Sequence, residues 1–349
     1  EAMDFTWPNI LTGLVRGEDL DASTTEWAMG EILAGNASPV QMAGFMVALR
    51  AKGETITELD ALANGMLAKA TPIDLPRNAV DVVGSGGDRA NTVNVSTMAA
   101  IVAAAAGAKV VKHGNRAASS MSGTADCLEA LGLALDVAPE RQRQVFDECG
   151  LVFLFAPLYH GSLRHTAPAR KELGIQTTFN FLGPLANPAR PDAQAIGMAN
   201  LHVAELVAGV LASRGNRGMV FHGEDGLDEL TTTTRSDIWL IGGGEAVRTE
   251  LNPADLGVQP AKPADLIGGP PARNAQVVRD VLAGGTGPVR EIVLLNAAAT
   301  LLAFDGPSLT EPVADQLRRP LERVAAAIDE GTAAELLVRW VDTTNRVRG

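Results

Sequence analysis

The stretch that decides the fold is VVGSGGDRANTVNVST, from Val82 to Thr97, and a second stretch, KHGNRAASSMSGTADCLEALG, follows from Lys112 to Gly132. Each begins as an apolar strand, continues as a loop of Gly, Asn, Ser and Thr, and then enters a helix. Loops of this kind direct backbone N–H groups at an anion, and their glycines let the backbone approach it closely. The two stretches therefore predict a phosphate-binding site, to which Lys112 and Arg116 add positive charge.

Short β-branched and apolar runs, separated by segments with helical spacing, begin after residue 79. The runs cover residues 80–83, 110–111, 151–155, 195–198 and 219–222. Such alternation predicts parallel βαβ units, so we expect an α/β fold with a central, mostly parallel sheet flanked by helices.

The first seventy or so residues have a different pattern, with apolar side chains at helical spacing and no strand-like run. N-cap signals for four short helices lie at Thr6, at Ser23 with Glu26, at Ser38 and at Thr57. The sequence therefore predicts a small all-helical domain in front of the larger α/β domain.

Length and composition agree with two domains and restrict the class of function. The chain has 349 residues, of which 46% are hydrophobic and 20% charged, as expected of a protein with a large buried core. Its net charge of −12 argues against nucleic acid as a partner. We expect neither a bilayer-spanning stretch nor a signal segment. Two cysteines cannot form a disulfide framework. We therefore expect a cytoplasmic protein without membrane contact.

The first loop contains GSGGD, Gly84 to Asp88, which lacks the GxGxxG spacing of dinucleotide-binding loops. Five further polar side chains follow where the helix begins: Asn91, Thr92, Asn94, Ser96 and Thr97. Ser96 or Thr97 could be a simple N-cap, but a cap needs one such residue. The surplus of donors favours phosphate binding.

The second loop, KHGNRAASS, places two cations, an imidazole, an amide and two hydroxyls directly after a strand. A third loop, HGEDGLDELTTTT from His222 to Thr234, offers Glu224, Asp225, Asp228 and Glu229. Mg²⁺ prefers one or two carboxylates together with substrate phosphates. An acidic loop opposite a phosphate site therefore predicts Mg²⁺, although solvated surface charge is the alternative.

Four blocks then resemble the anthranilate phosphoribosyltransferase family: GSGGDxxNTxNxST, KHGNRxxSSxxGxADxLEALG, ARKELGIQTTFNFLGPLANPA and GxDGLDELTTT. The blocks extend from Gly84 to Thr234 in order, and the helical regions on either side fit the same family. The resemblance implies an enzyme that transfers the 5-phosphoribosyl group from phosphoribosyl pyrophosphate (PRPP) to the amino group of anthranilate. It also implies a place in tryptophan biosynthesis and a homodimer.

The resemblance implies roles for individual residues. The PRPP-binding residues would be Gly84, Gly87, Asp88, Thr92, Asn94, Val95, Ser96, Thr97, Lys112, His113, Gly114, Asn115, Arg116, Ala117, Ala118, Ser119, Ser120 and Thr124. Ser96, Asp228 and Glu229 would ligate Mg²⁺, with two ions per subunit. Anthranilate would meet Gly84, His113, Asn115 and Arg170, with residues 159–164 lining its approach. No catalytic acid or base is implied; Lys112, Asn115 and Arg170 would act by positioning.

The expected domains are then a helical domain at residues 1–75, with a segment at about 164–182 that returns to it, and an α/β domain at 76–163 and 183–349. The return is expected because Arg170 must face the phosphate site from the opposite side, with the substrates in a cleft between the domains. Two rival functions remain at this stage: a pyrimidine nucleoside phosphorylase, and a non-enzymatic nucleic-acid-binding relative of the transferase. A magnesium requirement would exclude the first, and the negative net charge argues against the second.

Overall fold

The computed structural model describes residues 5–117 and 121–348, which divide into two compact units. Unit 1 comprises Glu1–Thr71 and Pro157–Pro188, and unit 2 comprises Pro72–Ala156 and Ala189–Gly349. The second segment of unit 1 is longer at both ends than the return expected at 164–182. Hydrogen bonds account for both ends: the N–H of Thr71 donates to the carbonyl of Tyr159 (2.8 Å), and Nε2 of His160 lies 2.7 Å from the carbonyl oxygen of Ala186.

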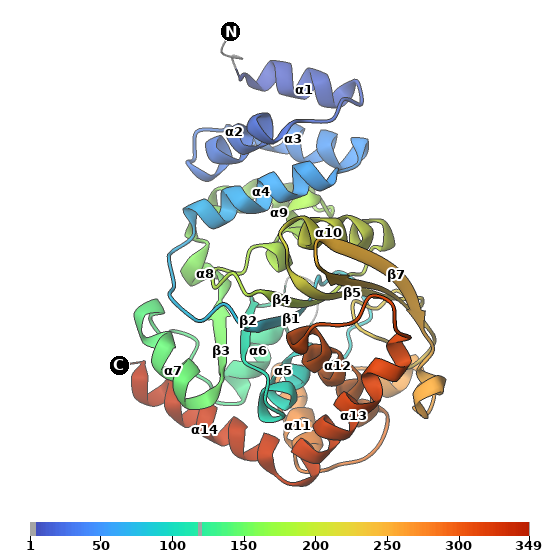
Figure 1. The fold of residues 1–349 in the computed structure, drawn as a ribbon. Coiled ribbons are helices and arrows are strands. Elements are labelled where there is room, and N and C mark those ends of the chain that lie inside the picture. Colours follow the sequence, from blue (N-terminus) through green and yellow to red (C-terminus); the bar gives the residue numbers. More distant parts are fainter. Residues whose placement is uncertain (1–4, 118–120, 349) are drawn as a thin grey trace. The chain divides into compact units, whose positions relative to one another are not determined.

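Unit 1 is helical, as expected (Figure 1). Its helices are α1 (Trp7–Val15), α2 (Ala22–Leu33), α3 (Pro39–Lys52), α4 (Ile56–Lys69) and α9 (Ala167–Leu173). Three 3-10 turns, Gly161–His165, Thr178–Phe181 and Gly183–Leu185, flank α9. The apolar faces of α1 to α4 are buried against one another, which is the usual source of stability for short helices.

Two of the four predicted N-caps are confirmed and two are wrong. Thr6 and Ser38 each accept the backbone N–H three residues later. The second helix begins after Asp21, not Ser23, because the Asp21 carboxylate accepts the N–H of Thr24 at 2.8 Å. The fourth begins after Thr55, not Thr57, where Thr55 and Glu58 form a reciprocal capping box.

Unit 2 is built on a seven-stranded sheet with the order β3-β2-β1-β4-β5-β6-β7. The strands are β1 (Val80–Gly84), β2 (Val110–Gly114), β3 (Leu151–Phe155), β4 (Ala193–Gly197), β5 (Arg217–Gly223), β6 (Ser236–Gly242) and β7 (Glu245–Leu251). Pairing from β3 to β5 is parallel, and β6 and β7 add an antiparallel edge. The mostly parallel sheet is thus confirmed, while the β6–β7 hairpin is an addition to the predicted strands.

Helices cover this sheet within unit 2. They are α5 (Val95–Ala105), α6 (Thr124–Ala130), α7 (Gln142–Cys149), α10 (Leu201–Ser213), α11 (Pro271–Leu282), α12 (Pro288–Asp305), α13 (Val313–Asp329) and α14 (Thr332–Val347). A short helix, α8 (Ala156–Tyr159), follows β3. Figure 1 shows α10 on the upper side of the sheet and α5 and α12 on the lower side.

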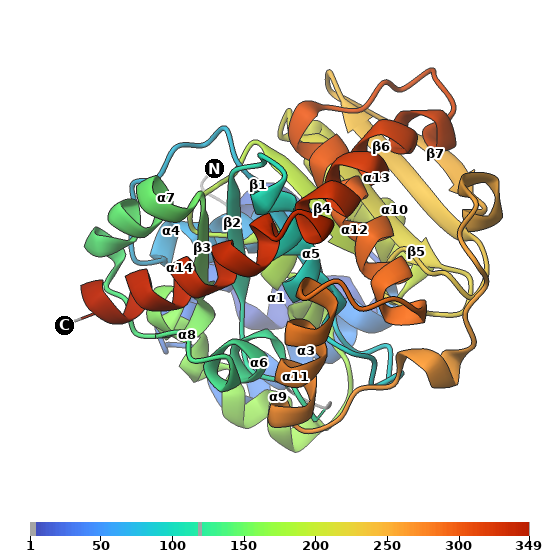
Figure 2. The ribbon, with the colours of Figure 1, turned by 90° about the horizontal axis from the view of Figure 1, so that it is seen from below.

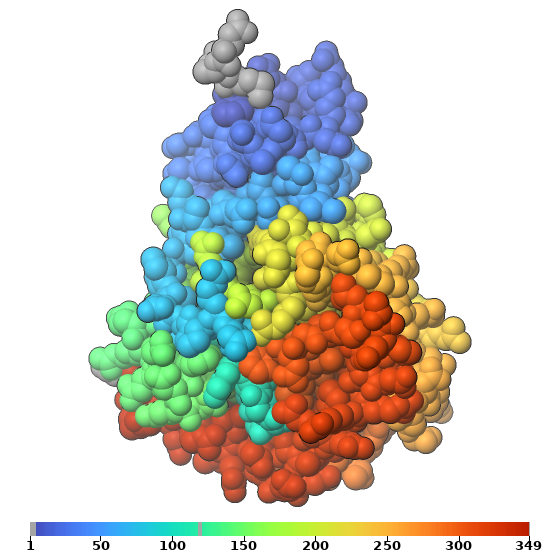
Figure 3. Space-filling model, viewed as in Figure 1, coloured from blue at the N-terminus to red at the C-terminus, as the bar shows by residue number. Residues whose placement is uncertain are grey.

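The C-terminal helices belong to the core of unit 2. Helix α12 packs on α5, α13 and the strands β1, β4 and β5, and α14 packs on α5 and α7 (Figure 2). In the view of Figure 3 the chain from α12 to the C-terminus forms much of the visible surface of this unit. In the described part of the chain, no helix is both long and apolar enough to cross a membrane.

The strand order fixes where a ligand is expected. The chain passes from β1 to β2 and β3 on one side, and then places β4 on the other side of β1. Such a reversal leaves a crevice beyond the carboxyl ends of the two strands at the switch, which are β1 and β4. Those ends are Gly84 and Gly197.

Candidate functional site

The first glycine-rich loop begins at the carboxyl end of β1 and is fastened to the end of β4. The N–H of Ser85 donates to the carbonyl of Gly197 (2.8 Å), and the Ser85 hydroxyl accepts the N–H of Ala199 (3.0 Å). Gly86 and Gly87 follow with φ of 75° and 78°, values that side-chain-bearing residues rarely adopt. The loop is therefore held at the predicted crevice with its backbone unshielded by side chains.

The beginning of α5 carries the hydroxyls expected to bind phosphate. The N-cap is Asn94, without a capping hydrogen bond from its side chain, so neither Ser96 nor Thr97 serves as the cap. Among the described residues the Thr97 hydroxyl is buried without a hydrogen-bond partner. A buried hydroxyl without a partner is unfavourable in a finished core, which is consistent with a ligand that completes the site.

Lys112 lies on β2 rather than in the second loop, and only 1% of it is exposed. Its ammonium donates to the carbonyl of Val82 (2.5 Å) and to the Ser96 hydroxyl (3.0 Å). Burial lowers the pKa of Lys112, and the nearby carboxylates of Asp81, Glu229 and Asp228 oppose that shift. The lysine is thus an internal positive charge beneath the loops.

His113, next to Lys112 on β2, is also buried, and its backbone N–H donates to the carboxylate of Asp81 at 3.4 Å. Gly114 ends the strand, and Asn115 beyond it is exposed. The Asn115 side-chain oxygen accepts the N–H of Arg116 at 2.7 Å. Two of the residues expected to contact anthranilate therefore lie close together in the chain: His113 is in β2, and Asn115 directly follows that strand.

The described ends of the second loop are joined by Asp126, a residue for which the sequence predicted no role of its own. Its carboxylate accepts the N–H groups of Ala117 (3.0 Å) and Gly123 (2.9 Å), and it pairs with Arg116 at 3.1 Å. Arg116 also pairs with Glu129 at 3.1 Å. Thr124 begins α6, and Ala118, Ser119 and Ser120 lie outside the described residues.

The acidic loop reaches the first loop directly. Asp228 accepts the N–H of Gly86 at 2.7 Å. A Cβ added to Gly84 would lie 2.5 Å from the Asp228 carboxylate, and one added to Gly197 would lie 1.9 Å from its main-chain carbonyl oxygen. Glycine is therefore required at the ends of β1 and β4 because the acidic loop occupies the space of a side chain.

The carboxylates of Asp88, Asp228 and Glu229 interact with one another here, and the buried ammonium of Lys112 is a positive charge that acts on Glu229. Asp228 and Glu229 are each 8% exposed. Burial, followed by the charge of Asp88, raises the pKa of Asp228 to about 8. Burial and the charges of Asp228 and Asp88 raise the pKa of Glu229 well above its usual value.

Such a cluster fits a bound cation, because a divalent ion would satisfy carboxylates that are otherwise costly to ionise. One oxygen of Asp88 is also buried without a hydrogen-bond partner in the described part of the chain. Within residues 5–117 and 121–348, no group of three or more His, Cys, Asp or Glu is arranged to hold a metal by itself. That arrangement suits Mg²⁺, which usually takes one or two carboxylates and completes its shell with phosphates and water.

The two other carboxylates of the acidic loop have a different position. Glu224 and Asp225 are exposed. Asp225 accepts hydrogen bonds from the hydroxyls of Thr231 and Thr233 and from the N–H of Leu227. Asp225 therefore stabilises the fold of the loop, and only Asp228 and Glu229 reach the site.

Arg170 lies on α9 in unit 1. Helix α9 packs on α3, and the segment after it is tied to the end of α3 by a hydrogen bond of 2.7 Å from Thr178 to the buried carboxylate of Glu54. Burial lowers the pKa of Arg170, and no carboxylate in the described residues opposes that shift. A half-buried guanidinium without an acidic partner is suited to an anionic ligand.

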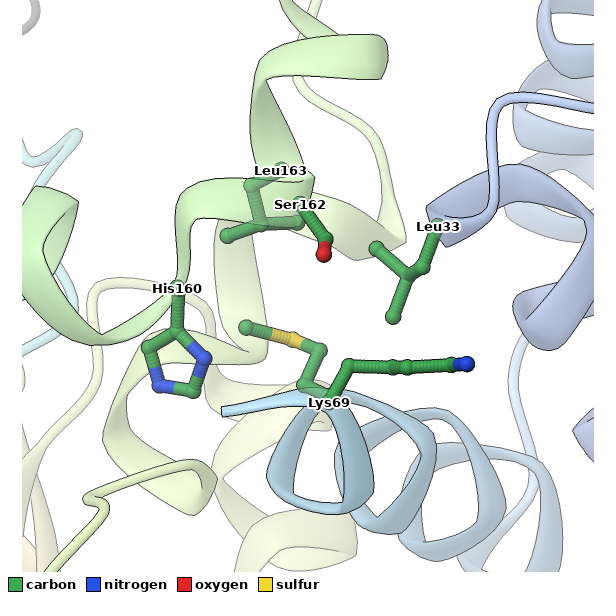
Figure 4. A pocket seen from close by; sticks show the side chains of 6 residues that line it. Leu33, Lys69, His160, Ser162 and Leu163 are labelled. Carbon is green, nitrogen blue, oxygen red and sulfur yellow. The ribbon is translucent and has the colours of Figure 1, made fainter. Parts of the chain in front are cut away.

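Unit 1 also contains a small surface hollow lined by Leu33, Met66, Lys69, His160, Ser162 and Leu163 (Figure 4). The Lys69 ammonium lies on the side away from His160, and the His160 ring is engaged with the carbonyl of Ala186. His160, Ser162 and Leu163 belong to the segment expected to line the approach of anthranilate, whereas none of the residues expected to bind PRPP or Mg²⁺ lines the hollow.

The fold and these loops match one known class of protein. Residues 8–70 match the helical bundle domain of a glycosyl transferase family, and residues 76–334 match the a/b domain of the same family. The chain belongs to this glycosyl transferase family.

Similar proteins of known name and a solved structure indicate which member of the glycosyl transferase family this chain resembles. The chain is 54% identical to anthranilate phosphoribosyltransferase of Arthrobacter sp. (strain FB24), over 99% of this chain and 97% of the relative. It is 53% identical to the enzyme of the same name from Nocardioides sp., over 98% and 99%. The crystal structure of anthranilate phosphoribosyltransferase from Thermus thermophilus matches with a TM-score of 0.88 at 39% identity, covering 96% of this chain and 99% of that one. The chain thus belongs to the anthranilate phosphoribosyltransferases.

A more distant structure shows ligands in the same fold. Anthranilate phosphoribosyltransferase from Saccharomyces cerevisiae, in complex with PRPP and Mg, matches with a TM-score of 0.87 at 25% identity over 98% of this chain and 99% of that one.

Proposed function

We propose that the chain transfers the 5-phosphoribosyl group of PRPP to the amino nitrogen of anthranilate, forming N-(5-phosphoribosyl)anthranilate and pyrophosphate. The observation that carries this proposal is the contact of the acidic loop with the glycine-rich loop beyond β1 and β4, where Asp228 accepts the N–H of Gly86. A phosphate loop and buried carboxylates in contact are suited to a phosphorylated substrate that brings a cation with it.

The donor would be bound by unit 2. Backbone N–H groups of the Gly84–Asp88 loop and the hydroxyls of Ser96 and Thr97 can donate to phosphate oxygens. Lys112 supports them from below, since its ammonium already holds the Ser96 hydroxyl. The remaining residues of the second loop, with Asn94 and Thr124, would complete this binding surface, as the resemblance implies.

Ser96, Asp228 and Glu229 would hold Mg²⁺, with two ions per subunit. The bound metal would neutralise charge on the departing pyrophosphate. The chain's own contribution is to supply two carboxylates from one loop and to fix that loop on the glycines at the strand ends.

The acceptor would be bound by its carboxylate. Arg170 has the planar, two-pronged donor geometry that matches a carboxylate, and among the described residues no acidic side chain opposes its shifted pKa. Gly84, His113 and Asn115 would contact the aromatic amine, as the resemblance implies.

We expect a dissociative displacement with inversion at C1 of the ribose. Lys112 and the backbone donors would stabilise the negative charge that develops on pyrophosphate. Alignment of the amine with C1 can supply much of the remaining rate enhancement, so no general acid or base is required among the predicted residues. Two copies are expected to form a homodimer in the cytoplasm, which size-exclusion chromatography and cell fractionation would test.

The test is to follow the loss of anthranilate fluorescence with purified protein, PRPP and Mg²⁺. We expect consumption of anthranilate that EDTA stops and added Mg²⁺ restores. Unchanged anthranilate, together with conversion of thymidine and phosphate to free base, would refute the proposal and favour a pyrimidine nucleoside phosphorylase. Inactivity in both assays with tight binding of RNA or DNA would favour the nucleic-acid-binding alternative.

A further inference from the structure

Asn296 is a polar residue in the middle of the buried part of α12 in unit 2. Helix α12 is buried over nearly all of Ile292 to Ala303, and only 1% of Asn296 is exposed. A buried carboxamide destabilises a core unless its donors and acceptor find partners. The position therefore calls for a structural explanation.

The partners of Asn296 lie mainly outside its own helix. Its side-chain oxygen accepts the N–H of Leu230 at 3.0 Å, and its side-chain nitrogen donates to the carbonyl of the same Leu230 at 2.9 Å. The nitrogen also donates to the carbonyl of Ile292 at 2.8 Å, one turn back in the helix. Only one orientation of the amide satisfies all three bonds, so the side chain is fixed.

Leu230 directly follows Asp228 and Glu229 in the chain. Asn296 thus binds both the backbone N–H and the backbone carbonyl of Leu230, the residue that follows the two carboxylate-bearing residues. On the other side, Asp228 is restrained by the N–H of Gly86 and by its close approach to Gly197. The two carboxylates are therefore held between the strand ends and α12.

We propose that Asn296 is a positioning residue for the magnesium-binding carboxylates. It keeps the backbone at Leu230 in place, so that Asp228 and Glu229 present their oxygens at the spacing that Mg²⁺ demands. Mg²⁺ tolerates little departure from octahedral geometry, which makes its binding sensitive to the support behind its ligands. The inference rests on the proposed function only in taking Asp228 and Glu229 as the metal ligands.

The test compares Asn296→Ala and Asn296→Ser with Thr300→Val. The serine variant retains a hydroxyl that can bond one turn back in α12, as Thr300 does to the carbonyl of Asn296 at 2.8 Å, so the helix is preserved while both bonds to Leu230 are lost. Thr300→Val is the matched control, since Thr300 is equally buried on the same helix and bonds within the helix.

Calorimetric titration with PRPP at increasing Mg²⁺, without anthranilate, measures the effect. We expect the Mg²⁺ concentration for half-maximal PRPP binding to rise about 10- to 100-fold in both Asn296 variants and to stay within about twofold in Thr300→Val. The KM for anthranilate, measured at saturating Mg²⁺, should change little. Circular dichroism identifies which variants are folded.

A folded Asn296→Ser with the Mg²⁺ requirement of the wild type would overturn the inference. So would a rise of equal size in Thr300→Val, because it would reflect general loosening of α12. Failure of the proposed function has a different signature: wild-type protein would bind PRPP with Mg²⁺ and leave anthranilate unchanged, while the comparison of variants would still decide the role of Asn296.

Discussion

Replacing Gly197 by alanine tests whether the end of β4 sets the position of the acidic loop. The added Cβ would lie 1.9 Å from the main-chain oxygen of Asp228 and 2.5 Å from its carbonyl carbon. Because both atoms belong to backbone, no side-chain rotation can relieve the clash. The Asp228 backbone would have to move by about 1.5 Å to reach ordinary van der Waals separation.

A displacement of that size is large for a metal-binding loop. Misplacement by about 1 Å commonly costs about 100-fold in rate, so we expect kcat/KM of Gly197→Ala to fall by at least about 100-fold. That loss corresponds to about 2.7 kcal/mol of transition-state stabilisation. Overpacking should also lower the free energy of unfolding by about 1–3 kcal/mol.

The assay measures kcat/KM from anthranilate fluorescence and the free energy of unfolding from urea titration. Gly242→Ala is the matched control, since Gly242 also ends a strand of the same sheet and an added Cβ there would meet no atom within 4 Å. A Gly197→Ala variant whose kcat/KM stays within about threefold of that of Gly242→Ala would refute the reasoning.

The other predictions concern the two substrates, the metal and the buried lysine. Arg170→Ala should raise the KM for anthranilate about 10- to 100-fold with little change for PRPP, because a charge-assisted hydrogen bond contributes about 1.5–3 kcal/mol; an equal rise for both substrates would contradict its assignment. Replacing Asp228 and Glu229 together by alanine should abolish turnover and remove the Mg²⁺ dependence of PRPP binding by calorimetry, whereas the exposed neighbour Glu224→Gln should behave as wild type; Mg²⁺-dependent binding that survives the double substitution would exclude them as ligands. Lys112→Met should lower kcat about 100-fold without unfolding the protein, because an apolar side chain of similar length avoids burying a charge, and near-normal kcat would show that this ammonium plays no part in the reaction.

Much of the fold could be predicted because its signals are local. The run Leu151–Phe155 was predicted as a strand with the bounds observed for β3, and the strands β1, β2, β4 and β5 were each placed within a few residues. Strand β7 was missed because it is an exposed edge strand with polar side chains, which has no buried apolar run. The two misplaced N-caps arose because two candidate oxygens lie two residues apart, and only backbone geometry selects one of them.

The sequence by itself determined the class of the protein. Glycine-rich loops after strands predicted a phosphate site and the acidic loop predicted Mg²⁺, because these residue types act through short-range chemistry. The phosphoribosyl transfer was implied by the resemblance of four sequence blocks to a known family. The residues expected to bind the substrates and the metal stay predictions, and one placement was wrong: Lys112 was expected in a loop, whereas the structure buries it in β2.

Tertiary structure decided how those residues are supported. Gly197 approaches Asp228 from a neighbouring strand, and Asn296 bonds Leu230 across 66 positions of sequence. No local pattern distinguishes that asparagine from others on a helix, since its partners are backbone groups of a distant loop. Contacts of this kind exist only after the sheet has placed β1, β4 and β5 side by side and α12 has packed against them, and they fix where the carboxylates point.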